Sequence, residues 1–85
     1  MNGDAPNGQL AEPVALATVL AAAERLFGRP VAAQENFFDL GGDSLIAIRL
    51  IAMVRGDGWA LAVEDVLDQP DMAALAATAE PEPAN

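Results

Sequence analysis

The sequence predicts a small all-α domain. Apolar residues recur at spacings of three and four along most of the chain, which is the period of an amphipathic helix. The 85 residues suffice for one modest hydrophobic core but not for two lobes around a substrate cleft. The chain contains no cysteine, so disulfide bonds cannot supplement that core. Together these observations predict one compact helical unit.

A first amphipathic helix is expected to begin at Pro13 and to end before Gly28. Proline suits the first turn of a helix, because an N–H at that position has no intrahelical partner. Gly28, with Pro30 two residues later, is typical of the end of a helix. The apolar stripe of this helix is expected to face the core, and it consists of Leu16, Val19, Leu20, Ala23, Leu26 and Phe27.

A long connection over residues 29–43 follows, and loops of this length usually carry a function. Phe37 and Phe38 are expected to anchor the loop, because burial of one large apolar side chain contributes about 1.5–3 kcal/mol. Gly41 and Gly42 permit backbone angles and a close approach that a side chain would obstruct.

A second helix is expected to begin at or beside Ser44, because Asp43 and Ser44 are both good N-cap residues. Its buried stripe is expected to contain Ala47, Leu50, Ile51 and Val54. The helix has further apolar residues that point in other directions. Ile46 and Ile48 could pack against the loop or the third helix, or they could belong to a docking face for partner proteins.

The rest of the chain predicts two short helices. Residues 56–58 form a turn, Trp59 is expected to be a packing anchor, and a turn of helix is expected around residues 63–67. Asp71 is a good N-cap for the last helix. Both ends are polar or rich in proline, so residues 1–12 and 79–85 are expected to be flexible tails around a domain at residues 13–78.

The composition excludes several kinds of function. The chain has no His, Cys, Lys or Tyr, so a Ser-His-Asp triad and a metal site of His and Cys cannot be built, and no metal ligand is assigned. Ser44 is the only serine, and only carboxylates within the chain could activate it. If this hydroxyl reacts, another protein must activate it, so the chain is not expected to be an enzyme.

The charge and hydropathy pattern excludes other partners. Thirteen acidic and four basic residues give a net charge of −9, which argues against binding to nucleic acid. No apolar stretch is long enough to span a membrane, and no secretory leader is visible. A monomeric, cytoplasmic protein is expected.

Two interpretations of Ser44 remain open at this stage. A serine at the start of a helix is commonly only a cap. Two preceding glycines, an acid before the hydroxyl, an apolar residue after it and the absence of any other serine favour an attachment point instead.

Residues 36–45, with the sequence NFFDLGGDSL, resemble the signature of peptidyl carrier proteins, the thiolation domains of nonribosomal peptide synthesis. The resemblance extends over about residues 16–77. It implies a four-helix carrier-protein bundle with a long loop between helices one and two. It also implies that Ser44 bears a covalent 4′-phosphopantetheine arm from coenzyme A, whose thiol holds an aminoacyl or peptidyl group as a thioester.

The resemblance also implies partners. A magnesium-dependent phosphopantetheinyl transferase would modify Ser44, with Asp43 as a nearby acid that helps to position the metal and Gly41 and Gly42 as backbone accommodation. An adenylation enzyme and downstream condensation or tailoring enzymes in natural-product or antibiotic biosynthesis would then use the loaded carrier. The docking residues expected on the second helix are Leu45, Arg49 and Met53.

Carriers of fatty acid and polyketide synthesis usually have a larger apolar residue in place of Gly42 and an acidic second helix in place of Arg49 and Arg55, so the peptidyl class is favoured. The positions of Met1 and of the acidic tail favour a free-standing carrier. A noncovalent helical interaction module and a small enzyme remain as alternatives. The carrier requires modification of Ser44, whereas the interaction module would bind its partner unmodified.

Overall fold

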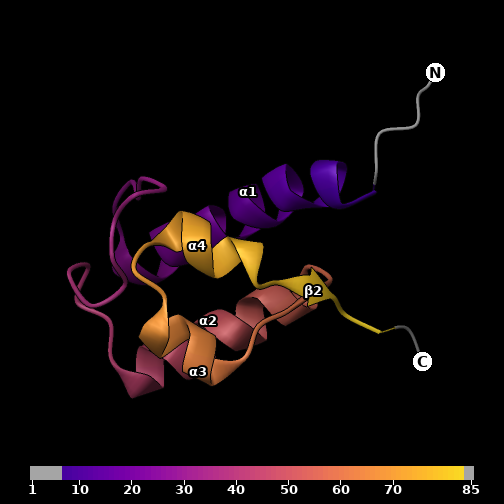
Figure 1. Ribbon diagram of the computed structural model, residues 1–85. Coiled ribbons are helices and arrows are strands. Elements are labelled where there is room, and N and C mark those ends of the chain that lie inside the picture. Colours follow the sequence, from indigo (N-terminus) through magenta and orange to yellow (C-terminus); the bar gives the residue numbers. More distant parts are fainter. Residues whose placement is uncertain (1–6, 84–85) are drawn as a thin grey trace.

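A computed structural model describes the backbone of residues 7–83 and the side chains of residues 13–83. Its elements are, in order, α1 (Asn7–Phe27), α2 (Ser44–Gly56), β1 (Trp59–Ala60), α3 (Val63–Asp68), α4 (Met72–Ala77) and β2 (Glu80–Pro81). The long helix α1 packs against α2 and α4, while α3 lies along α2 (Figure 1). The predicted all-α, four-helix architecture is confirmed.

The core lies where the apolar faces of the four helices meet. Its largest fully buried side chains are Val19, Leu50, Val54, Val66, Met72 and Leu75. The stripe predicted for the first helix lies in this core or packs against it, as do the predicted residues of α2. Trp59 is half-buried against the same cluster, so its expected role as a packing anchor is confirmed.

The first helix begins earlier than the sequence suggested. It starts at Asn7 rather than at Pro13, which lies inside it. A proline within a helix removes the hydrogen bond that its own N–H would donate and crowds the carbonyl four residues before it, but residues 9–12 are good helix formers that favour the helical conformation. The helix therefore continues across Pro13, and the N-terminal tail expected at residues 1–12 is wrong for residues 7–12. Residues 1–6 lie outside the described part of the chain.

The C-terminal segment is also more structured than expected. β2 pairs with β1 in antiparallel register, with Trp59 opposite Pro81 and Ala60 opposite Glu80. The N–H of Glu82 donates to the carbonyl of Gly58 at 2.9 Å. The expected flexible tail at residues 79–85 is therefore wrong for Glu80–Pro81 and Glu82. Two-residue strands are too short to produce an alternating pattern, so no feature of the sequence predicts this sheet.

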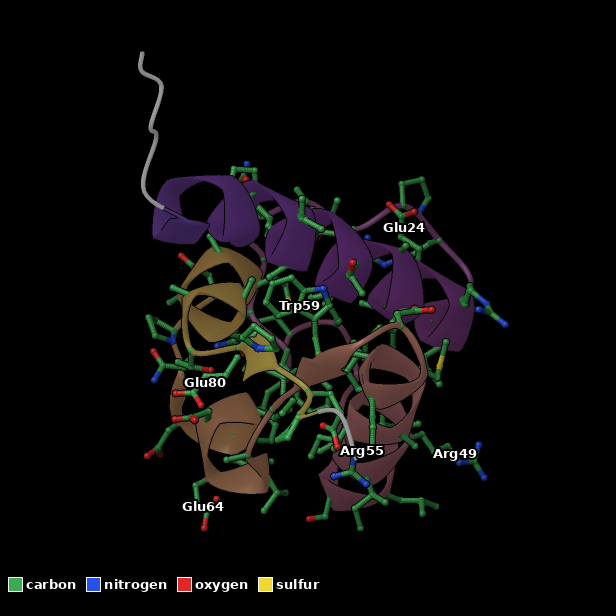
Figure 2. All side chains as sticks on the ribbon, turned by 90° about the vertical axis from the view of Figure 1, so that its right-hand side faces the viewer. Glu24, Arg49, Arg55, Trp59, Glu64 and Glu80 are labelled. Atoms are coloured by element: carbon green, nitrogen blue, oxygen red, sulfur yellow. The ribbon has the colours of Figure 1, made fainter. Side chains whose placement is uncertain are left out.

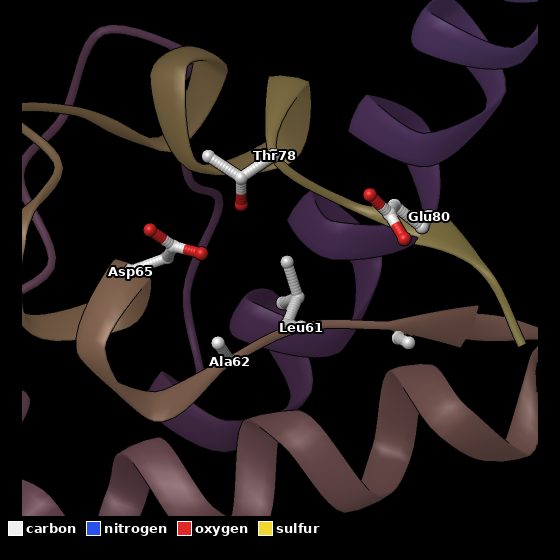
Figure 3. A pocket seen from close by; sticks show the side chains of 6 residues that line it. Leu61, Ala62, Asp65, Thr78 and Glu80 are labelled. Carbon is white, nitrogen blue, oxygen red and sulfur yellow. The ribbon is translucent and has the colours of Figure 1, made fainter.

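A hollow of about 340 Å³ lies beside this sheet. Residues of β1, α3, β2 and the end of α4 line it, and Figure 3 shows the Asp65 carboxylate and the Thr78 hydroxyl facing it. Residues 29–44 contribute nothing to its lining. In the described part of the chain, no helix has both the length and the apolar character to cross a membrane.

Candidate functional site

Ser44 is the first residue of α2, and its side chain is exposed. The preceding residue, Asp43, has an extended backbone, and its Oδ1 accepts the N–H of Ile46 at 2.9 Å. Asp43 is therefore the N-cap. Within the described residues, the Ser44 hydroxyl makes no hydrogen bond, so it is not occupied by capping.

The start of α2 provides a favourable place for an anion. The N–H groups of Ser44 and Leu45 donate to no acceptor in the described part of the chain, and the first turn of the helix contains no acidic residue. Unpaired amides and the helix dipole together place partial positive charge at this end. A phosphate ester on the Ser44 oxygen would lie within this field.

The two glycines before Ser44 have different roles. Gly41 has a φ of +103°, which strongly disfavours any side chain. Gly42 donates its N–H to the Phe37 carbonyl at 3.0 Å, and a Cβ added to it would overlap the Phe37 ring. The expected backbone freedom is therefore found at Gly41, and the expected close approach is found at Gly42.

Phe37 anchors the loop, but Phe38 does not. Phe37 is 2% exposed and makes an edge contact with Phe27, with ring centroids 5.9 Å apart. The ring centroid of Phe38 lies 5.7 Å from that of Phe37, yet the Phe38 side chain remains 49% exposed. The expectation that both rings anchor the loop is therefore wrong for Phe38, because the interior beneath the loop accommodates one ring and Gly42 closes over it.

Asn36 organises the same loop through both ends of its amide. Its Oδ1 accepts the N–H groups of Phe38 and Asp39 at 2.8 and 3.1 Å, and its Nδ2 donates to the Pro70 carbonyl at 2.9 Å. The loop before Ser44 is thus tied to the chain just before α4. This role of Asn36 was not predicted, although an asparagine side chain at the start of a turn commonly accepts a hydrogen bond from the backbone N–H two residues on.

Further bonds hold the first half of the loop. The Glu35 and Ala33 carbonyls accept the N–H groups of Met72 and Ala73 at 2.9 and 2.8 Å, which satisfies the first amides of α4. The Glu35 carboxylate accepts the N–H of Ala32 at 2.8 Å and pairs with Arg29 at 3.0 Å. The hydrogen bond from Ala32, followed by that from Arg29, lowers the pKa of Glu35.

This pKa shift predicts an acid-sensitive loop. A carboxyl with a lowered pKa in the folded state stabilises the fold fully above its unfolded pKa, which is about 4.3 for glutamate. The contribution is lost as the pH falls through the lower folded value. We expect Glu35→Gln to reduce the free energy of unfolding at neutral pH and the difference from the wild type to vanish in acid, as measured by urea unfolding at several pH values. A difference that persists in acid would contradict this assignment.

The residues expected on a docking face differ in exposure. Leu45 is 58% exposed and Arg49 is exposed, whereas Met53 is half-buried against the core. The two isoleucines differ as well: Ile46 packs against the core, whereas Ile48 is 58% exposed and is available for a docking face. Leu45, Ile48 and Arg49 share one face of α2, directly after Ser44. We call these three residues the α2 face.

Comparisons with known proteins agree on one family. The family model described as "Phosphopantetheine attachment site" matches residues 17–79. Nonribosomal peptide synthetase 6 of Aspergillus fumigatus is 46% identical over 48 residues, which are 56% of this chain and 4% of that protein. D-lysergyl-peptide-synthetase subunit 2 of Epichloe festucae var. lolii is 50% identical over 46 residues, which are 54% of this chain and 3% of that protein.

A solved structure described as a "Non Ribosomal PCP domain" is similar over 98% of this chain and 100% of its own, with a TM-score of 0.76 and 32% sequence identity. The chain thus spans only a few per cent of the curated relatives, but the whole of this structural neighbour.

Proposed function

Because the chain belongs to the phosphopantetheine attachment-site family, we propose that Ser44 is the residue to which its 4′-phosphopantetheine group is attached. Members of this family carry that group covalently, and the chain is a peptidyl carrier protein of nonribosomal peptide synthesis. The observation that carries the assignment to Ser44 is an exposed hydroxyl at the start of α2 that makes no hydrogen bond within the described residues.

The residues around Ser44 fit a 4′-phosphopantetheine group. The unpaired N–H groups of Ser44 and Leu45 suit a phosphodiester, and Gly41 and Gly42 permit the backbone path that presents Ser44 at the start of α2. When attached, the group supplies a thiol that forms a thioester. The protein presents the attachment point, and partner enzymes supply the catalysis.

The proposal also assigns roles to neighbouring residues and partners. The second carboxylate oxygen of Asp43, beyond the one that caps α2, would help a phosphopantetheinyl transferase to position its magnesium ion. An adenylation enzyme would load the thiol, and condensation or tailoring enzymes would use the product. These enzymes would dock on the α2 face, with Met53 at its margin. The carrier is proposed to act as a cytoplasmic monomer.

The thioester function can be tested without the adenylation enzyme. Apo protein is incubated with an aminoacyl-coenzyme A, magnesium and a transferase of broad carrier specificity, and the product is treated with neutral hydroxylamine. We expect one aminoacyl phosphopantetheine per chain and release of the aminoacyl group alone. If the protein gains no mass, or if hydroxylamine leaves the acyl group in place, the proposed function is wrong.

Leu45→Asp is expected to slow modification of Ser44 by at least tenfold in kcat/KM without unfolding the protein. The side chain is 58% exposed beside the proposed attachment point, so its loss affects a contacting partner more than the core. Val14→Asp is a matched control, because Val14 is a 56% exposed apolar residue on α1. Modification is followed by intact mass over time and folding by circular dichroism. Equal modification rates for the two variants would show that Leu45 is not a docking residue.

A further inference from the structure

The four arginines of the chain differ in what surrounds them. Arg29 pairs with Glu35 at 3.0 Å, and Arg55 pairs with Glu82 at 3.7 Å. Arg25 lies in the last turn of α1, where the helix dipole favours a cation. Arg49 lies in the middle of α2, where no helix terminus stabilises it, and makes no ion pair with the described residues. Figure 2 shows its side chain projecting away from the bundle.

The charges around Ser44 have an order along the chain. Asp39 and Asp43 precede Ser44 and are exposed, whereas no acidic residue occurs between Asp43 and Asp57. The surface is therefore acidic before the hydroxyl and basic after it, on a chain whose net charge is −9. Since Arg55 is engaged by the C-terminal segment, Arg49 is the cation of the α2 face.

An enzyme that modifies Ser44 must cover this cation at least in part. At a rise of 1.5 Å per residue, Arg49 lies about 7.5 Å along the helix axis from Ser44, with Leu45 and Ile48 between them. An enzyme surface that brings its reacting atoms to the Ser44 oxygen extends over this stretch of about one and a half turns. Removing a guanidinium from water without a partner is costly, so a surface that tolerates Arg49 needs an acceptor there.

We propose that the transferase which modifies Ser44 places a carboxylate opposite Arg49 and a positively charged surface opposite Asp39 and Asp43. This inference rests on the proposed function. The two oppositely charged contacts on either side of Ser44 fix the direction in which the enzyme lies along α2, and the apolar side chains between them complete the contact. Arg55 takes no part, because Glu82 already pairs with it.

The test compares two substitutions with equal effects on net charge. Arg49→Glu and Arg25→Glu each replace an exposed arginine by glutamate on a helix, so long-range repulsion changes equally. The probe is a phosphopantetheinyl transferase of broad carrier specificity with coenzyme A and magnesium. At low ionic strength we expect kcat/KM to fall about tenfold for Arg49→Glu and less than twofold for Arg25→Glu. Arg49→Lys keeps the charge and should restore most of the rate.

The response to salt separates an ion pair from lost packing. At 1 M salt the screening length is about 3 Å, so exposed charge pairs are weakened. The loss of kcat/KM in Arg49→Glu should therefore shrink from about tenfold towards twofold at this salt concentration. Equal rates for the two glutamate variants, or a deficit that salt leaves unchanged, would overturn the pairing while the proposed function stood. Failure of the folded wild-type protein to be modified at Ser44 would overturn the proposed function and this inference with it.

Discussion

Ser44→Ala is expected to abolish attachment of phosphopantetheine while leaving the fold intact. The variant removes the only serine, and the remaining hydroxyls belong to Thr18 and Thr78. Thr78 donates its hydroxyl to the Leu75 carbonyl at 2.7 Å. Because Ser44 is exposed and makes no hydrogen bond within the described residues, its loss should change the free energy of unfolding by no more than about 0.5 kcal/mol.

A fluorescent coenzyme A conjugate measures this result directly. Labelling of the wild type but not of Ser44→Ala, at equal thermal stability, is the expected outcome, and Thr78→Ala should label like the wild type. Labelling of Ser44→Ala would place the attachment point elsewhere.

Phe37→Ala is expected to cause the largest loss of stability. The ring is 2% exposed, contacts Phe27 edge to face and fills the space against Gly42. Removing a buried phenylalanine side chain costs about 3–5 kcal/mol, which is a large part of the stability of a small domain. The loop before Ser44 would lose its anchor, so modification should slow as well.

Phe38→Ala is the matched control, because this neighbouring ring is 49% exposed. Its cost should stay below about 1 kcal/mol, since a surface side chain away from the core contributes little to folding. Urea unfolding of both variants measures the difference. If Phe37→Ala proved no more destabilising than Phe38→Ala, the loop would not depend on this ring.

The helices that were predicted best have both an apolar period and a good cap. Asp71 caps α4 by accepting the N–H of Ala74, as its position suggested. For α2 the sequence could not separate the two candidate caps, because Asp43 and Ser44 are both suited to that role. The structure assigns the cap to Asp43, and this assignment leaves the Ser44 hydroxyl free.

Other features depend on contacts between distant segments. The bond from Asn36 to the Pro70 carbonyl joins residues 34 positions apart, and the pairing of β1 with β2 has no local pattern. The same holds for Phe37 and Phe38, which are identical in type and adjacent in sequence but differ in burial. The sequence likewise does not decide between burial and exposure of Ile48, because the outcome depends on how the helices pack. These details could not follow from composition or spacing.

The intact mass of the wild-type protein after incubation with coenzyme A, magnesium and a phosphopantetheinyl transferase tests the central claim most directly. We expect a gain of one phosphopantetheinyl group per chain, located by fragmentation in the peptide that contains Ser44. No gain in protein that circular dichroism shows to be folded, or a gain on another residue, would contradict the assignment of Ser44 as the attachment point.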